Sequence, residues 1–210
     1  MKGQLYFDVI SPFAYFMLEQ VDQLPEQLDI EYRPVLLAGL LDHFNHKGPA
    51  EIPSKRVFIY RKVLLEADKL GIPLRFPPAH PFNPLSLLRL TLLVGNDLDR
   101  IRTVTRHVWA SGMLPETEAE LDALGVTVGV AQASQAIRRD EVKQQLRQNF
   151  QDAVDAGVFG VPTMVVDGQL FWGADSIDML TAFLADPDLF QHGEMARISD
   201  LPVGVMRKTN

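Results

Sequence analysis

Ser11 is the residue whose type and position are best suited to chemistry. A strand-like alternation of side chains runs from Leu5 to Val9, and Ser11-Pro12 follows, a pair typical of the first positions of a helix. The Ser11 hydroxyl would then lie beside unpaired backbone N–H groups at the positive end of a helix dipole, where an anion is stabilised. The alternative is a plain N-cap with no further function, since Ser begins many helices.

The absence of cysteine limits which anion this position can stabilise. The chain contains no Cys, which excludes disulfides, thiolate metal ligands and dithiol redox chemistry by its own side chains. A cysteine at a helix N-terminus would supply its own thiolate there. Because the side chain of Ser11 is an alcohol, we expect the anion to be a thiolate supplied by a ligand, with Ser11 orienting and stabilising it rather than attacking.

The elements around Ser11 are predicted to form a β-α-β unit. Apolar residues at helical spacing follow Ser11 as far as Pro25, and a short strand then passes through Ile30, Tyr32 and Val35. From about residue 38 to residue 157 the pattern changes to helices and loops without strand signals. One of these helices is predicted to end at Gly71, a residue typical of helix ends.

The strand pattern returns near the C-terminus. Two strand-like runs, 163–166 and 169–172, flank Asp167-Gly168, a pair typical of a two-residue type I′ hairpin turn. A helix is predicted next, with Asp175 as its N-cap. Residues 187–210 carry no clear periodicity.

This order of elements predicts an α/β thioredoxin-like fold, β-α-β and later β-β-α, with a large all-helical insertion. We predict a discontinuous thioredoxin-like domain over residues 1–37 and 158–186. The helical insertion would occupy residues 38–157, and residues 187–210 would form a C-terminal tail. In such a fold the Val161-Pro162 bond that enters the third strand is expected to be cis, leaving the backbone of Val161 free to pair with an extended peptide.

Four motifs, in order along the chain, carry a family resemblance. They are Phe7-Asp8-Val9-Ile10-Ser11-Pro12-Phe13-Ala14-Tyr15, Arg33-Pro34-Val35-Leu36-Leu37, Val158-Phe159-Gly160-Val161-Pro162-Thr163 and Phe171-Trp172-Gly173-Ala174-Asp175. Together they resemble the 2-hydroxychromene-2-carboxylate isomerases and the kappa-class glutathione transferases, in the disulfide-oxidoreductase-like branch of the thioredoxin fold. The likeness covers residues 5 to about 184.

The resemblance implies glutathione as the cofactor. Ser11 would face its thiol, and Val161-Pro162 would pair with its cysteinyl backbone. Asp175 and Ser176 would receive its γ-glutamyl end, and Trp172 would form an aromatic wall. The chain departs from the family at Ser176, where relatives usually carry Arg, so that a bidentate partner for the γ-glutamyl carboxylate is lost.

The second substrate is expected to be a small conjugated, aromatic electrophile. The helical insertion would cover it, with Phe13, Lys55 and Asn83 as contacts. Asn83 lies in His80-Pro81-Phe82-Asn83-Pro84-Leu85, which is similar to the substrate loop of the family. A solvated Lys55 and a turn-forming Asn83 are the alternatives. Tyr60 and Trp109 are expected to pack in the core.

The implied activity is that of a glutathione-dependent isomerase. The bound thiolate would add to a conjugated carbon, the former double bond would rotate, and elimination would return the thiol with the other isomer. A kappa-type glutathione transferase, which would stop at the adduct, and a non-catalytic module that binds a peptide at Val161-Pro162 are the alternatives. A serine hydrolase is disfavoured because Ser11 lacks a Gly-x-Ser-x-Gly turn.

Composition disfavours several other classes of partner. With 20 basic and 27 acidic residues the net charge is −7, and no dense run of Lys or Arg occurs, so nucleic acid and anionic membranes are poor partners. No apolar stretch approaches the ~20 residues that span a bilayer, and the N-terminus lacks a signal-peptide pattern, so we expect a cytoplasmic protein. The five histidines show no metal-binding spacing, so we expect no metal site. The resemblance suggests a homodimer.

Overall fold

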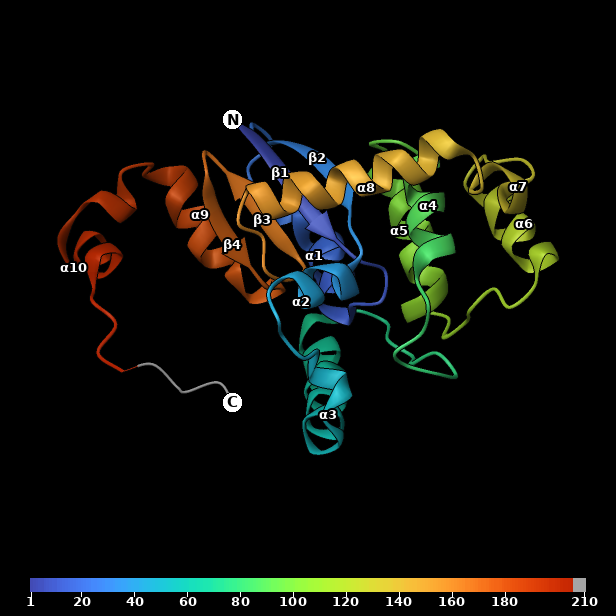
Figure 1. The fold of residues 1–210 in the computed structure, drawn as a ribbon, viewed down its shortest axis with the longest axis horizontal. Coiled ribbons are helices and arrows are strands. Elements are labelled where there is room, and N and C mark those ends of the chain that lie inside the picture. Colours follow the sequence, from blue (N-terminus) through green and yellow to red (C-terminus); the bar gives the residue numbers. More distant parts are fainter. Residues whose placement is uncertain (206–210) are drawn as a thin grey trace.

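A four-stranded mixed sheet forms the centre of the computed structural model, which describes residues 1–205 (Figure 1). Its strands are β1 (Lys2–Phe7), β2 (Asp29–Pro34), β3 (Thr163–Val166) and β4 (Gln169–Trp172). The order across the sheet is β2-β1-β3-β4, with β1 parallel to β2 and antiparallel to β3, and with β3 antiparallel to β4. This topology confirms the predicted thioredoxin-like fold.

Helices make up most of the remaining described residues. They are α1 (Pro12–Gln20), α2 (Leu37–His43), α3 (Pro53–Leu70), α4 (Leu85–Leu93), α5 (Leu98–Trp109), α6 (Glu118–Thr127), α7 (Ala133–Ala136), α8 (Asp140–Asp155), α9 (Ile177–Ala185) and α10 (Gly193–Arg197). Short 3-10 turns lie at Val21–Gln23, Pro49–Glu51, Ala174–Ser176, Leu189–Gln191 and Ile198–Asp200. No strand lies between β2 and β3 in the described part of the chain, as the sequence predicts.

The turns that the sequence predicts are confirmed at two places. Gly71 ends α3 with a φ of 66°, in the left-handed region that glycine adopts without strain. Asp167 and Gly168 both have positive φ, 48° and 76°, and Val166 pairs with Gln169 across them, which is the geometry of a type I′ turn.

The prediction of Asp175 as a helix N-cap is wrong. A 3-10 turn over Ala174–Ser176 precedes α9, and the hydroxyl of Ser176 donates a hydrogen bond to the carbonyl of Gly173 at 2.7 Å. Ser176 is therefore the residue at the N-cap position of α9, although its side chain does not cap the helix. The carboxylate of Asp175 is left exposed to solvent.

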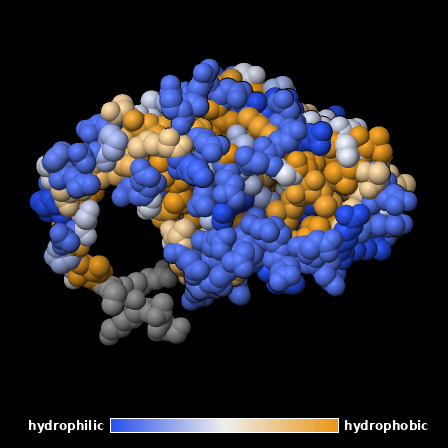
Figure 2. Space-filling model, turned by 90° about the horizontal axis from the view of Figure 1, so that it is seen from above, coloured by the Kyte–Doolittle hydropathy of each residue, from blue (hydrophilic) through white to orange (hydrophobic). Residues whose placement is uncertain are grey.

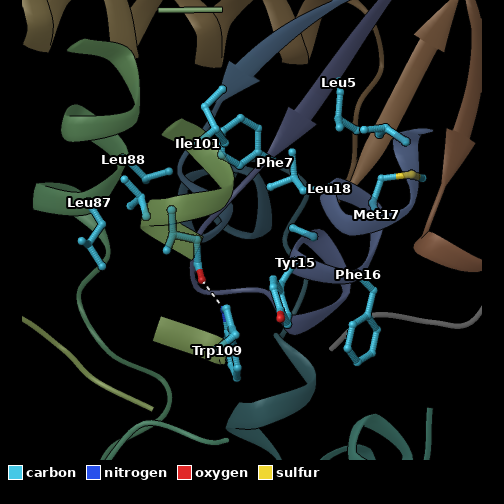
Figure 3. Packing of buried hydrophobic residues seen from close by; sticks show 14 of the residues in the cluster. Leu5, Phe7, Tyr15, Phe16, Met17, Leu18, Leu87, Leu88, Ile101 and Trp109 are labelled. Atoms are coloured by element: carbon cyan, nitrogen blue, oxygen red, sulfur yellow. Dashed lines mark hydrogen bonds between the residues drawn. The ribbon is translucent and has the colours of Figure 1, made fainter. Parts of the chain in front are cut away.

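The two faces of the sheet are covered by different helices, because successive side chains of β1 point to opposite faces. Leu5 and Phe7 belong to a large apolar cluster with α1, α4, α5 and α9 (Figure 3). Tyr6 faces the other way and packs in a second cluster with residues of α2 and α8. Figure 1 shows α8 lying across the sheet.

Polar contacts also attach α8 to the sheet. Arg33 of β2 forms a salt bridge with Asp152 at 2.6 Å, and the side-chain amide of Asn149 donates to the carbonyl of Pro34 at 3.0 Å. The sheet and the segment that we predicted as a helical insertion thus share this interface. The division of the chain into domains remains a prediction, and we propose that α8 be grouped with the sheet.

Beyond α9, Leu189 and Phe190 still pack against the core, and the segment that follows them stands away from the body and leaves an opening in the space-filling view (Figure 2). It contains the short helix α10, and several of its apolar side chains are exposed, among them Ile198, Leu201 and Val203. Residues 206–210, the end of the predicted tail, lie outside the described residues. Within residues 1–205 no helix is long and apolar enough to cross a bilayer.

Candidate functional site

The pairing of the strands brings the predicted glutathione-binding residues to one end of the sheet. Tyr6 near the end of β1 pairs with Thr163 at the start of β3, and Thr163 pairs with Trp172 at the end of β4. Ser11, which follows β1, and Val161-Pro162, which precede β3, therefore emerge at the same end, beside Trp172. Residues far apart in the sequence are thus assembled here by antiparallel register.

Ser11 is the N-cap of α1, as the sequence predicts. Its hydroxyl oxygen accepts a hydrogen bond from the backbone N–H of Ala14 at 3.2 Å, Pro12 occupies the first helical position, and Ser11 is only 7% exposed. The capping bond uses the oxygen as an acceptor and leaves the hydroxyl proton available to donate. The cap and an anion-stabilising role are therefore compatible.

Three side chains hold the loop that leads from β1 to Ser11: Asp8 and Trp109, which are fully buried, and His80, which is half-buried. The carboxylate of Asp8 accepts from the backbone N–H of Ile10 at 3.0 Å and of Leu37 at 2.8 Å. The indole of Trp109 donates to the carbonyl of Val9 at 2.7 Å, the dashed line in Figure 3, and His80 Nε2 donates to the carbonyl of Ile10 at 2.9 Å. The N–H and C=O of Ile10 and the C=O of Val9 thus have side-chain partners within the protein.

The hydrogen bonds of His80 fix its tautomer. A backbone carbonyl can only accept, so Nε2 carries the proton. Nδ1 of the neutral ring accepts from the Tyr60 hydroxyl, 2.6 Å away, whose single proton is shared with the backbone carbonyl of His80 at 2.8 Å. Burial lowers the pKa of His80, and the bond to Ile10 opposes this shift. A neutral His80 satisfies both contacts. The His80-Pro81 peptide bond is cis.

Asp8 is the most strongly perturbed carboxyl group of the site. It is fully buried, and burial raises its pKa to about 7, although the N–H donors of Ile10 and Leu37 favour the charged form. No cation neutralises it among the described residues. Asp8 therefore changes its protonation state near neutral pH, directly below the loop that carries Ser11.

The Val161-Pro162 bond is cis, as predicted. Val161 is 8% exposed, and within residues 1–205 its backbone N–H and C=O have no hydrogen-bond partner. Trp172 is 56% exposed and lies next to this step, where a Cβ on Gly160 would meet its Nε1 at 2.8 Å. An exposed indole and an unpaired backbone segment thus adjoin each other.

A groove of about 270 Å³ lies between α1, α3 and the start of α9. Phe13 and Asp175 both line it, so the structure brings together one residue predicted for the electrophile and one predicted for glutathione. Lys62, Glu66 and Asp178 also line the groove. Lys62 Nζ lies 5.8 Å from the centre of the Phe13 ring.

The other seven predicted site residues do not line this groove. Ser11, Val161, Pro162 and Trp172 lie at the end of the sheet described above, and the remaining three are Ser176, Lys55 and Asn83. Ser176 is buried behind its bond to Gly173, and Lys55 is exposed in the first turn of α3. The side chain of Asn83 accepts from the N–H of Leu85 at 3.1 Å, a turn-forming contact at the start of α4. The roles of all predicted site residues in binding remain predictions. No group of three or more potential metal ligands occurs among the described residues.

A family model places the chain among known proteins. The model of the DSBA-like thioredoxin domain matches residues 4–185. The chain belongs to this family. Two relatives are each 29% identical: a glutathione S-transferase kappa 2 of Caenorhabditis elegans, covering 88% of this chain and 92% of the relative, and a 2-hydroxychromene-2-carboxylate isomerase of Sphingobium xenophagum, covering 86% and 96%.

Solved structures agree on the fold of this DSBA-like thioredoxin protein. A 2-hydroxychromene-2-carboxylate isomerase superposes with a TM-score of 0.79 at 24% identity, over 88% of this chain and 95% of that structure. The resemblance predicted from the four motifs is confirmed, and the named relatives are enzymes. Because the chain resembles these enzymes over most of its length, it is itself an enzyme.

Sequence reasoning missed four residues of the site. His80 and Tyr60 were expected in other roles, and Asp8 appeared only within a motif, although an acidic residue between buried strand positions is a usable signal. Lys62 carries no signal in the sequence, since it is one of several basic residues on α3.

Asp8→Asn is expected to remove a specific part of the pH dependence of stability. The folded protein keeps a proton on Asp8 up to a pKa of about 7, whereas the unfolded chain releases it near ~3.9. The free energy of unfolding of the wild type should therefore fall, relative to the variant, as pH rises from about 4 to about 7. Urea unfolding at pH 4.5, 6 and 8 measures this. A difference between the two proteins that stays constant with pH would contradict the assignment.

Proposed function

We propose that the protein is a glutathione-dependent isomerase of the 2-hydroxychromene-2-carboxylate type. The observation that carries this proposal is the hydroxyl of Ser11, which has a proton to donate at the N-terminus of α1 and lies at the same sheet end as the unpaired backbone of Val161. Both features suit a small thiol peptide. The absence of Cys leaves the thiol to be supplied by the ligand.

Glutathione would bind in extended form across this end of the sheet. Its cysteinyl N–H and C=O would pair with the free backbone groups of Val161, in the manner of an added strand. Its thiolate would accept from the Ser11 hydroxyl and from the positive end of α1. Asp175 would receive the γ-glutamyl ammonium, and Trp172 would cover one side of the ligand.

The reaction needs no redox change. The thiolate sulfur forms a bond to the electron-poor end of a conjugated double bond, and the electron pair moves into the acceptor group. The carbon–carbon bond, now single, rotates. The electron pair then returns, re-forms the double bond and expels the thiolate, which Ser11 stabilises again. Phe13, Lys55 and Asn83 are proposed to contact the electrophile.

A kappa-type transferase is the second candidate, because relatives of both kinds match with equal identity. It would use the same thiolate and protonate the adduct instead of expelling the thiolate. Incubation with glutathione and a chromene-type substrate separates the two activities, since only the isomerase regenerates free glutathione. We propose a cytoplasmic location, where glutathione is abundant.

Ser11→Ala is expected to raise the pKa of bound glutathione. The variant loses the donor to the thiolate, and the loss of the cap lowers stability by about 1 kcal/mol. Thiolate absorbance of the glutathione complex, followed across pH, measures the shift, which we expect to reach about one pH unit. No saturable glutathione binding by the wild type would contradict the proposal.

Ser11→Asp is the matched control for the helix cap. An aspartate keeps a capping acceptor, so the stability of α1 should be retained. It offers no proton near neutral pH and adds a negative charge beside the sulfur, so the thiol pKa should rise further than in Ser11→Ala. A thiol pKa equal to that of the wild type in both variants would reduce Ser11 to a cap.

We also propose a homodimer that uses the outer face of α3. Only Val63 and Ala67 of its 18 residues are buried. At about 3.6 residues per turn, Phe58 and Leu65 fall on the opposite side and Val57 and Leu64 on the adjoining flank, and all four are 45–67% exposed. A helix with so little packing needs a partner surface. Figure 1 shows α3 projecting from the body.

The proposed occupant of this face is a second copy of the chain, because the face is self-complementary. Arg61 and Asp68 lie in the middle of the apolar stripe, on either side of Leu64 and Leu65. In an antiparallel pair with its two-fold axis between Leu64 and Leu65, Arg61 of each copy would oppose Asp68 of the other. A symmetric contact of this kind is isologous and closes as a dimer.

Arg61→Asp is expected to break the proposed dimer, because it places two acidic pairs at the contact. The dissociation constant should rise by about tenfold or more, as measured by sedimentation equilibrium. The double variant Arg61→Asp, Asp68→Arg restores opposite charges and should dimerise again. A monomeric wild type, or a double variant no better than the single one, would contradict the proposed interface.

A further inference from the structure

The groove between α1, α3 and α9 has a mixed set of charges. Three carboxylates line it, those of Glu66, Asp175 and Asp178, and Lys62 is its single base among the described residues. Phe13 and Phe16 supply an apolar floor from α1. A pocket of this kind suits a ligand end that carries an ammonium and a carboxylate together.

Lys62 is free to take a ligand. Glu66, one turn further along α3, pairs with Lys69 instead, at 4.0 Å, and Lys62 forms no salt bridge within residues 1–205. Its ammonium lies 5.8 Å from the centre of the Phe13 ring, so the side chain is directed toward α1 rather than into solvent away from the groove.

The residue that follows Asp175 cannot take this role. Ser176 is buried, and its hydroxyl is engaged with the carbonyl of Gly173. Its side chain is also neutral, so the start of α9 supplies no positive side chain for a carboxylate. The other bases in the first half of α3, among them Lys55, do not line the groove.

We propose that Lys62 binds the α-carboxylate of the γ-glutamyl end of glutathione, while Asp175 on the opposite wall binds its α-ammonium. The proposal rests on the proposed function and deepens it, since it assigns the specificity for the γ-glutamyl group to two different elements. Lys62, which would bind the carboxylate, belongs to α3. The same helix carries Tyr60, whose hydroxyl contacts His80. Binding of this end of the ligand therefore connects α3 to the start of α9.

The test compares two ligands on two proteins by isothermal titration calorimetry. The ligands are glutathione and γ-aminobutyryl-cysteinyl-glycine, which lacks only the α-carboxylate. The wild type should bind glutathione about tenfold more tightly than the analogue, as expected for one partly exposed charge-assisted contact. Lys62→Gln should lose this difference, because its affinity for glutathione falls while its affinity for the analogue stays the same. Lys62→Arg should retain the difference.

Lys2→Gln is the matched control. It removes the same charge at the start of β1, the end of the sheet away from Ser11, and should leave both affinities unchanged. Glutathione binding by Lys62→Gln equal to that of the wild type, or an equal loss for both ligands, would overturn the role of Lys62 and leave the proposed function intact. No glutathione binding by the wild type would overturn both.

Discussion

The arrangement of the site depends on how the polar backbone of residues 8–11 is satisfied. This loop is buried, and an unpaired N–H or C=O there would destabilise the fold by about 1–3 kcal/mol. The partners come from three places: Asp8 directly after β1, Trp109 at the end of α5, and His80 in the loop before α4. The loop before Ser11 is thus anchored by three different elements, and the Ser11 hydroxyl proton remains available to donate.

The sheet and its turns could be predicted because their signals are local. Alternation in residues 5–9 and the Asp167-Gly168 pair each act within a few residues, so the sequence alone predicts the β3–β4 hairpin with its bounds. It also predicts that β1 exists, although the strand begins at Lys2 and ends at Phe7. The convergence of Ser11 and Val161 follows once the strands pair in antiparallel register. The predicted thioredoxin-like fold supplied the cis bond before Pro162, which local propensity alone does not decide.

The remaining site residues could not be predicted because their roles are set by tertiary contacts. Tyr60 is an apolar-face residue of α3 by its spacing, yet its hydroxyl meets His80 from a loop 20 residues away. Asp175 fits the pattern of an N-cap, but a 3-10 turn intervenes before α9 and moves the helix start past it. Several bases of α3 are equivalent in sequence, and only packing against α1 distinguishes Lys62.

The charge of the chain explains why the site must rely on short-range contacts. Glutathione is an anion at neutral pH, and its thiolate adds a further negative charge, whereas the protein carries a net charge of −7. Charges farther away than about 10 Å are largely screened, so the groups next to the ligand decide affinity. The N-terminus of α1, the backbone N–H of Val161 and the ammonium of Lys62 are such groups. Because Asp175 opposes Lys62 across the groove, the arrangement favours a ligand whose end carries both an ammonium and a carboxylate over a ligand with two negative charges. The acidic residues around the groove then contribute to specificity instead of preventing binding.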